Sequence, residues 1–325
     1  MKNLLARILM GTGLMCALAA PIARADEYPS RPIRLVVPYA AGGAGDVIAR
    51  LVAEHVSKRL GQPIIADNRP GAATVLAASQ VARSAPDGYT LLFGTLAHSL
   101  NATLQTKLPF DPVNDFEFIG KVGQVSFLLV TKPRLPVNDL RGLVALMQKQ
   151  PGKLTFGSAG VGSPMHLGGE LLKHLSNTDA VHVPYKGESA ALTDLLGGQL
   201  DFMLCTTTTC ASRVKDGTLK ALAVTSPQRS PVAPSIPTTA EAGIPGFQVY
   251  TWVFLASPKG TPSTVVDRLQ RALNEVLANP QFKQRALAIG FETNPHTSPA
   301  ALKSMVQSEI LKWRPIIKAS GMESN

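Results

Sequence analysis

A strand, a glycine turn and an amphipathic helix follow one another within residues 35–60, and this succession constrains the fold more than any other feature. The apolar run at 35–37 ends at Pro38 and predicts the end of a buried strand. After the turn, apolar residues recur at three- and four-residue steps, as on a helix packed against a sheet: Ile48, Leu51, Val52, Val56 and Leu60. Asp46 is the predicted N-cap of this helix. Because residues 40–45 are only alanine and glycine, a ligand can reach backbone N–H groups at the positive end of the helix, and the turn predicts an anion site.

The same order of strand, small-residue turn and helix returns at residues 154–175. Ser163 is the predicted N-cap of the second helix, and Pro164 fits its first position. The predicted buried stripe of this helix consists of Leu167, Leu171, Leu172 and Leu175. Two such helix N-termini together predict a clamp for an anionic ligand.

The order of predicted elements indicates an α/β fold with two lobes, each a mixed, mainly parallel sheet flanked by helices. Three strands alternate with helices in the first part of the chain, and a loop is predicted at 94–98 after the third strand. Apolar runs at 125–130 and 248–256 are predicted to be hinge strands that cross between the lobes. The first domain is therefore discontinuous: residues 26–124 plus 252–325 form domain 1, and residues 125–251 form domain 2.

The first 25 residues have the pattern of a secretory signal peptide. Lys2 and Arg7 precede an apolar segment, and small residues stand at Ala23 and Ala25, so cleavage is expected after Ala25 and the mature chain is expected to be exported. The apolar segment is too short to span a membrane as a helix. Cys16 suggests a lipoprotein, but the preceding residue in lipoproteins is small, and here it is Met15.

Charge and cysteine content exclude several classes of protein. The formal net charge of +10 falls to +7 when the signal peptide is removed, and such a basic surface favours anionic ligands. The basic residues are scattered rather than clustered with aromatic residues, which is not the pattern of a nucleic-acid-binding protein. Cys205 and Cys210 could form a local disulfide or remain free thiols. Neither has a further cysteine or histidine at metal-ligand spacing, so we expect neither a metal nor a cofactor.

The sequence contains no catalytic signature such as G-x-S-x-G, H-E-x-x-H or a Walker lysine, and we expect no enzyme activity. The nearest enzyme class is a dinucleotide-binding fold, because Asp67 follows the first turn by about twenty residues. The glycines do not fit G-x-G-x-x-G, since Ile48 stands at the third position after Gly43 and Gly45. Among six dispersed histidines, only His166 lies in a predicted ligand-binding turn.

Nine stretches of the chain carry a family resemblance: YPSRPIRLVVPYAAGGAGD, NRPGA, APDGYTLL, KLPFDPVNDF, PGKLTFGSAGVGSPMHL, VHVPYKG, ALTDLLGGQLDFM, LKALAVTS and PTTAEAGIPGF. With these stretches the mature chain resembles the solute-binding proteins of tripartite tricarboxylate transporters, the Bug family, over nearly its whole length. The resemblance implies a type II-like periplasmic binding protein that closes on a small carboxylate and delivers it to membrane permease subunits. A monomer is expected. A carboxylate-sensing receptor of a signalling system and an exported α/β enzyme are the alternatives.

The resemblance also assigns ligand-binding positions in both turns and nearby loops. The predicted binding residues are Tyr39, Ala40, Gly43, Gly45, Asp46, Thr95, His98, Ser158, Gly160, Gly162, Ser163, His166 and Cys205. The chain departs from the family pattern at Gly45, where a hydroxyl residue is usual, and at Cys205, where aspartate is usual. The loop after Gly94 is one residue short. Without that aspartate, an amino-acid ligand is less expected than a dicarboxylate or an aromatic acid.

Overall fold

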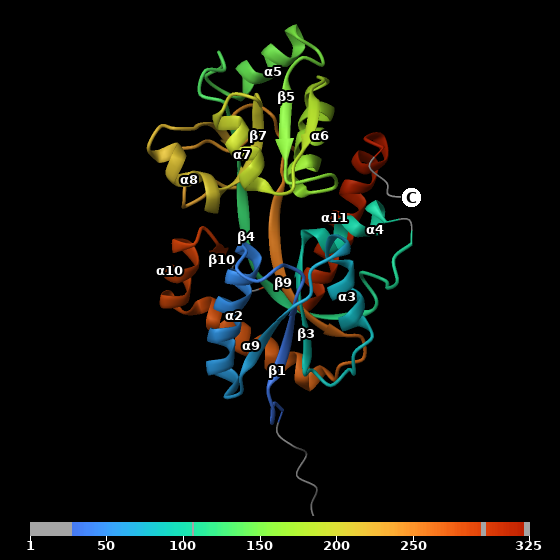
Figure 1. Cartoon of the computed structure of the whole chain (residues 1–325). Helices are drawn as coiled ribbons and strands as arrows, with labels where there is room; N and C mark the ends of the chain where they lie inside the picture. The colour runs from blue at the N-terminus through green and yellow to red at the C-terminus, as the bar shows by residue number, and fades with distance from the viewer. Residues whose placement is uncertain (1–27, 106, 294–296, 322–325) are drawn as a thin grey trace, which may run out of the picture.

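Two α/β lobes, one above the other in Figure 1, make up the computed structural model of the chain, which describes residues 28–105, 107–293 and 297–321. The predicted signal peptide, with its cleavage after Ala25, lies outside these residues. In the described part of the chain no helix is both long and apolar enough to cross a membrane.

The first lobe begins with three strand–helix units. In chain order these are β1 (Ile33–Val37), α2 (Ala44–Leu60), β2 (Ile64–Asn68), the short 3₁₀ helix η1 (Ala72–Thr74), α3 (Val75–Ala82), β3 (Thr90–Thr95) and α4 (Leu96–Leu104). The strands pair in parallel, as the sequence predicts, and their order in the sheet is β2-β1-β3. The predicted loop at 94–98 is wrong, because Gly94 and Thr95 continue β3 by pairing with the antiparallel β9, and α4 begins at once.

The second lobe contains the inserted part of the chain. Its elements are α5 (Leu140–Lys149), β5 (Thr155–Ser158), α6 (Pro164–Ser176), β6 (Val181–Pro184), α7 (Glu188–Leu196), β7 (Phe202–Thr206), α8 (Thr207–Lys215) and β8 (Lys220–Val224). The chain then returns to the first lobe through β9 (Tyr250–Pro258), α9 (Ser263–Ala278), α10 (Pro280–Ala288), β10 (Glu292–Thr293) and α11 (Pro299–Ala319).

The two predicted crossing strands are present. β4 (Phe116–Thr131) pairs with β9 in the first lobe and, over its last residues, with β7 and β8 in the second. β9 begins beside the second lobe, where the Val249 N–H donates to the Thr225 carbonyl, and enters the first lobe between β3 and β4. A single hydrogen-bonded path of strands therefore runs through both lobes (Figure 1).

Helix α11 forms a third link between the lobes. It packs on α4 and β4 of the first lobe and on α6 of the second. Its Trp313 and Ile317 are fully buried, and Trp313 shares one continuous core with Phe254 of the first lobe and Phe156 of the second. The lobes are thus joined by apolar packing along one side and by two strands through the centre.

The predicted helix stripes are mostly buried, with one exception. Leu175, in the last turn of α6, is 41% exposed, because it borders an open groove beside α5. The N-cap assigned to Asp46 is wrong: α2 begins at Ala44 with Gly43 as its N-cap, and Asp46 lies buried in the first turn. Its side chain reaches back to the turn instead of capping the helix from outside.

Candidate functional site

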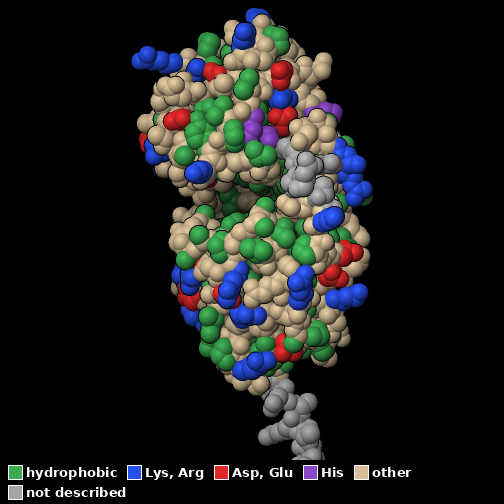
Figure 2. All heavy atoms as spheres, turned by 45° about the vertical axis from the view of Figure 1, so that its right-hand side comes forward, with side chains coloured by type: hydrophobic (Ala, Val, Ile, Leu, Met, Phe, Trp, Pro, Cys, Tyr) green, Lys and Arg blue, Asp and Glu red, His purple; other side chains and the backbone are tan. Residues whose placement is uncertain are grey.

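A cavity of about 420 Å³ lies between the lobes, where the carboxyl ends of β1, β3 and β5 meet. Ligands of open α/β sheets bind at such strand ends. The space-filling view shows the molecule hollowed between its lobes (Figure 2). The residues that line the cavity are Tyr39, Ala73, Thr74, Thr95, Ala97, Leu104 and Gln105 from the first lobe, Thr251 from β9, and Ala159, Val161, Gly162, Ser163 and Pro164 from the second lobe.

The second predicted turn forms the upper wall of the cavity. Ser163 caps α6, because its hydroxyl oxygen accepts from the His166 N–H at 3.3 Å, and Pro164 occupies the first helical position. Both predictions are confirmed. The Ser163 O–H is then free to donate toward the cavity. In the described residues the N–H groups of Ala159 and Val161 have no protein acceptor, so they add two further donors.

The other amides of this turn are engaged within the protein. The Gly162 N–H donates to His166 Nδ1 at 3.1 Å, and the Gly160 N–H donates to Ser158 Oγ at 3.1 Å. The Ser158 hydroxyl in turn donates to the Gly160 carbonyl at 3.0 Å. Ser158, Gly160 and His166 therefore shape the turn from behind and do not line the cavity.

Two stacked imidazoles support this turn. The rings of His166 and His182 lie 3.6 Å apart at an angle of 9°. Since the Ser158 hydroxyl already donates elsewhere, His182 Nε2 donates to Ser158 Oγ over 2.7 Å. The pKa of each histidine is lowered to about 4, chiefly by burial, with a contribution from Lys173 to both and from His182 to that of His166. Both rings are neutral at pH 7, which leaves His166 Nδ1 able to accept from Gly162.

The first predicted turn is closed by its own aspartate. Asp46 accepts from the Gly42 N–H, from Arg50 Nε and from Asn68 Nδ2, each at 2.9 Å. The hydrogen bond from Arg50, with those from Gly42 and Asn68, lowers the pKa of Asp46 to about 2. The N-terminus of α2 therefore already holds an anion, and Ala40, Gly43 and Asp46 do not line the cavity.

Tyr39 is the residue of the first turn that reaches the cavity. Its hydroxyl lies 2.9 Å from Thr95 Oγ1, and both side chains line the cavity. The ring lies so close to the start of α2 that any side chain at Gly45 would overlap it. Gly45 therefore acts by making room for Tyr39.

The sequence reasoning missed a third wall of the cavity, at Ala73 and Thr74. Ala72, Ala73 and Thr74 have φ values of 44°, 49° and 82°, a left-handed run that alanine and threonine rarely adopt. Asn101 holds this run, since its Nδ2 donates to the Ala73 carbonyl at 2.7 Å and to Thr74 Oγ1 at 3.3 Å. In the sequence, the small residues that follow NRPG were the only local indication of this wall of the cavity.

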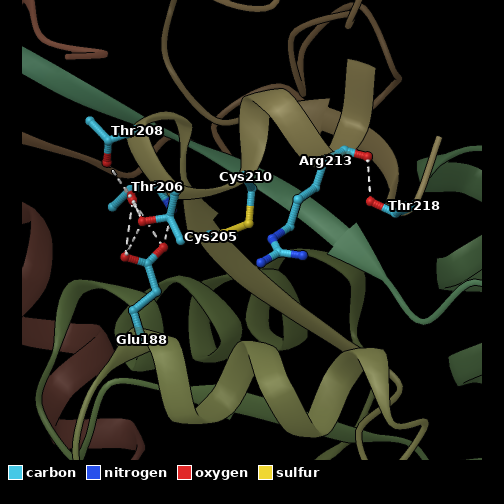
Figure 3. The surroundings of a disulfide bond; sticks show 8 residues. Glu188, Cys205, Thr206, Thr208, Cys210, Arg213 and Thr218 are labelled. Carbon is cyan, nitrogen blue, oxygen red and sulfur yellow. Dashed lines mark hydrogen bonds between the residues drawn. A yellow bond between two sulfur atoms is a disulfide. The ribbon is translucent and has the colours of Figure 1, made fainter. Parts of the chain in front are cut away.

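Two further predicted site residues lie away from the cavity and belong to neither turn. His98 is buried in α4, where its Nε2 donates to the Pro112 carbonyl at 2.8 Å and its ring packs among phenylalanines. Burial lowers its pKa to about 4. Cys205 is fully buried and forms a disulfide with Cys210, which resolves the pairing that the sequence left open (Figure 3).

The disulfide lies beside a closed polar cluster. The Glu188 carboxylate accepts from the Thr206 N–H and hydroxyl (Figure 3). It also accepts from the Thr209 hydroxyl. Burial raises the pKa of Glu188, although these hydrogen bonds act in the opposite direction. The cluster does not line the cavity, so its carboxylate is not available to a ligand there.

Comparison with known proteins agrees with this architecture. A family model described as the tripartite tricarboxylate transporter family receptor matches residues 48–322. The chain is similar to the periplasmic binding protein BugD, with 36% identity, a TM-score of 0.77, and coverage of 92% of this chain and 100% of that one. It is also similar to Rpa4515 of R. palustris with adipate, at 33% identity, a TM-score of 0.79, and coverage of 91% and 99%. MatC of Rhodopseudomonas palustris with bound malate shares 34% identity, a TM-score of 0.76, and coverage of 89% and 100%.

Proposed function

Because the chain belongs to the tripartite tricarboxylate transporter receptor family, the Bug solute-binding proteins, we propose that it captures a small organic carboxylate between its lobes and delivers it to membrane permease subunits. Two similar proteins have structures with adipate and with malate, which are both carboxylates. Family membership implies a receptor rather than an enzyme.

The observation that carries this proposal is the wall of the cavity formed by the N-terminus of α6. Ser163 and the amides of Ala159 and Val161 present donors at the positive end of the helix. Donors of this kind bind carboxylates through charge-assisted hydrogen bonds, which are roughly twice as strong as neutral ones.

We propose two roles for the predicted site residues. The residues that line the cavity contact the ligand directly, and these are Tyr39, Thr95, Gly162 and Ser163. The residues that hold the two turns in shape are Gly45, Asp46, Ser158, Gly160 and His166, while Ala40 and Gly43 are exposed parts of the first turn. The same proposal includes export with cleavage after Ala25 and a monomeric state. It also includes hinge motion between two domains, which are residues 26–124 plus 252–325 and residues 125–251.

A thermal-shift screen of the secreted chain against organic acids tests this function. A ligand at a hundred times its dissociation constant adds about 2.7 kcal/mol of stability, which for a chain of this size raises the melting temperature by roughly 5 °C. A screen of aliphatic and aromatic acids in which none stabilises the protein would contradict the proposal.

A matched pair of cap variants tests the site. Ser163→Gly removes the donor hydroxyl at a cost of only a few tenths of a kcal/mol in helix stability, because glycine is also a good N-cap. We expect the affinity for the best acid of the screen to fall about tenfold. Ser298→Gly is the control, since Ser298 caps α11 with a proline at the next position and lies outside the cavity. Equal affinities in both variants would place the carboxylate elsewhere.

A further inference from the structure

We propose that Asn101, which does not line the cavity, is a positioning residue for the ligand: it holds the left-handed run 72–74 of the first-lobe wall and directs the Thr74 hydroxyl toward the ligand. This inference rests on the proposed function and deepens it, because it names a residue that acts on the same cavity from behind. Three observations carry it: the conformation of the run, the hydrogen bonds of Asn101 and the missing side-chain cap of α3.

The run that leads into α3 has a backbone conformation that its own residues do not favour. Ala72, Ala73 and Thr74 all have positive φ values, and Ala73 and Thr74 line the cavity. A single residue of these types adopts the left-handed region occasionally, whereas three in succession carry a strain that the surrounding structure must compensate. A contact from outside the run is therefore needed to keep this wall in shape.

Asn101 provides this contact from α4. Its side chain is buried, and its Nδ2 donates to the Ala73 carbonyl at 2.7 Å and to Thr74 Oγ1 at 3.3 Å. Because a carbonyl oxygen can only accept, the first bond fixes the amide with its nitrogen toward the run, and Thr74 Oγ1 is therefore the acceptor of the second. Since α4 packs on α11, the run is held by a helix that is itself fixed in the core.

The hydrogen bond from Asn101 determines what the Thr74 hydroxyl can do. Because Thr74 Oγ1 accepts on the Asn101 side, its O–H donates in another direction, and the residue lines the cavity. A threonine before a helix usually accepts an N–H of the first helical turn, but the left-handed Thr74 makes no such cap on α3. Asn101 therefore keeps a hydroxyl donor at the cavity and the α3 N-terminus without a side-chain cap beside it.

Calorimetry of Asn101→Ala with the best acid of the screen tests the inference, and we expect the affinity to fall at least tenfold. Asn279→Ala is the matched control, because Asn279 also makes two hydrogen bonds to the backbone, at the start of α10, and lies outside the cavity. We expect the control to lose less than twofold. A smaller loss in Asn101→Ala, or an equal loss in the control, overturns the inference and leaves the proposed function standing. If no acid binds the wild type, the proposed function fails and the inference fails with it.

A glycine in the run distinguishes support of the run from packing around Asn101. Ala72 is exposed, does not line the cavity and has a φ of 44°, which glycine adopts without strain, so Ala72→Gly reduces the need for support. We expect this substitution to raise the affinity at least threefold more in the Asn101→Ala variant than in the wild type. A smaller difference would overturn the inference, because Asn101 would then act through the packing of α4 rather than through the run.

Discussion

Replacing Asp46 by asparagine removes the charge that closes the first turn. The carboxylate has three partners: the Gly42 N–H, Arg50 and Asn68. Its pKa falls from an ordinary value of 3.8 to about 2, chiefly through the hydrogen bond from Arg50. Each pKa unit corresponds to about 1.4 kcal/mol of stability. The Arg50 side chain is 54% exposed and partly screened, so we expect Asp46→Asn to cost about 1 to 2 kcal/mol at pH 7.

The pH dependence of this loss distinguishes charge from packing. Because the pKa of Asp46 is lower in the folded state, its contribution is full above about pH 4 and is lost as the pH falls toward 2. Urea unfolding of the wild type and Asp46→Asn at pH 7, 4 and 3 measures the difference. Asp267→Asn makes the same chemical change at an exposed position of α9 and should change stability little at any of these values.

Two results would refute this reasoning. If Asp46→Asn were as stable as the wild type at pH 7, the charge would contribute nothing to the turn. If the full loss persisted at pH 3, the asparagine side chain would be acting through packing rather than charge. We also expect Asp46→Asn to improve the binding of dicarboxylates relative to monocarboxylates, because the α2 N-terminus then lacks its internal anion.

Three further predictions concern other parts of the site. Stability should fall between pH 6.5 and 4, because His166 and His182, with pKa values of about 4, stay neutral in the folded state while the unfolded chain takes up protons. Melting temperatures at pH 7.5 and 5 measure this fall, and His182→Asn should show a smaller one. Gly45→Ala should displace the Tyr39 ring and weaken ligand binding at least tenfold in calorimetry, whereas Gly43→Ala, which has room for the methyl group, should bind normally. Replacing Cys205 and Cys210 by serine should cost about 2 kcal/mol in urea unfolding by loop-closure entropy, and unchanged stability would contradict a structural role for the disulfide.

Periodic patterns predicted most of the architecture because each pattern reflects a contact that the element must make. The apolar run at 125–130 predicted that β4 crosses between the lobes, since a strand buried in both lobes has no polar face. The pair Ser163 and Pro164 predicted the start of α6, because both residues satisfy local backbone requirements. Each of these patterns lies within a few residues of the structural feature that it predicts.

The missed features depend on residues far apart in the sequence. The left-handed run at Ala73 and Thr74 is held by Asn101, which lies 28 and 27 residues away. The role of Asp46 was misjudged because Asn68, 22 residues later, helps to turn its carboxylate toward the loop. His98 follows a strand end as a ligand residue would, yet α4 turns its ring into an aromatic cluster. No spacing rule in the local sequence contains these contacts.

Both turns are held by a hydrogen bond from a glycine N–H to a side chain of the following helix, but the accepting side chains differ in charge. We expect this difference to determine which turn can bind an anion. In each helix the third residue, Asp46 in α2 and His166 in α6, accepts the N–H of the glycine before the N-cap. The aspartate compensates the helix dipole, whereas the neutral imidazole leaves it for the ligand.

Exchanging that acceptor in the second lobe should therefore abolish binding. His166→Asp keeps an acceptor for the Gly162 N–H but brings a negative charge to the α6 N-terminus, and we expect the carboxylate affinity to fall at least a hundredfold. His166→Asn keeps a neutral acceptor and should lose less than tenfold. Calorimetry of both variants with the best acid of the screen gives the comparison, and melting curves without ligand establish that both are folded. If His166→Asp bound as tightly as His166→Asn, the uncompensated helix N-terminus would not be what holds the carboxylate.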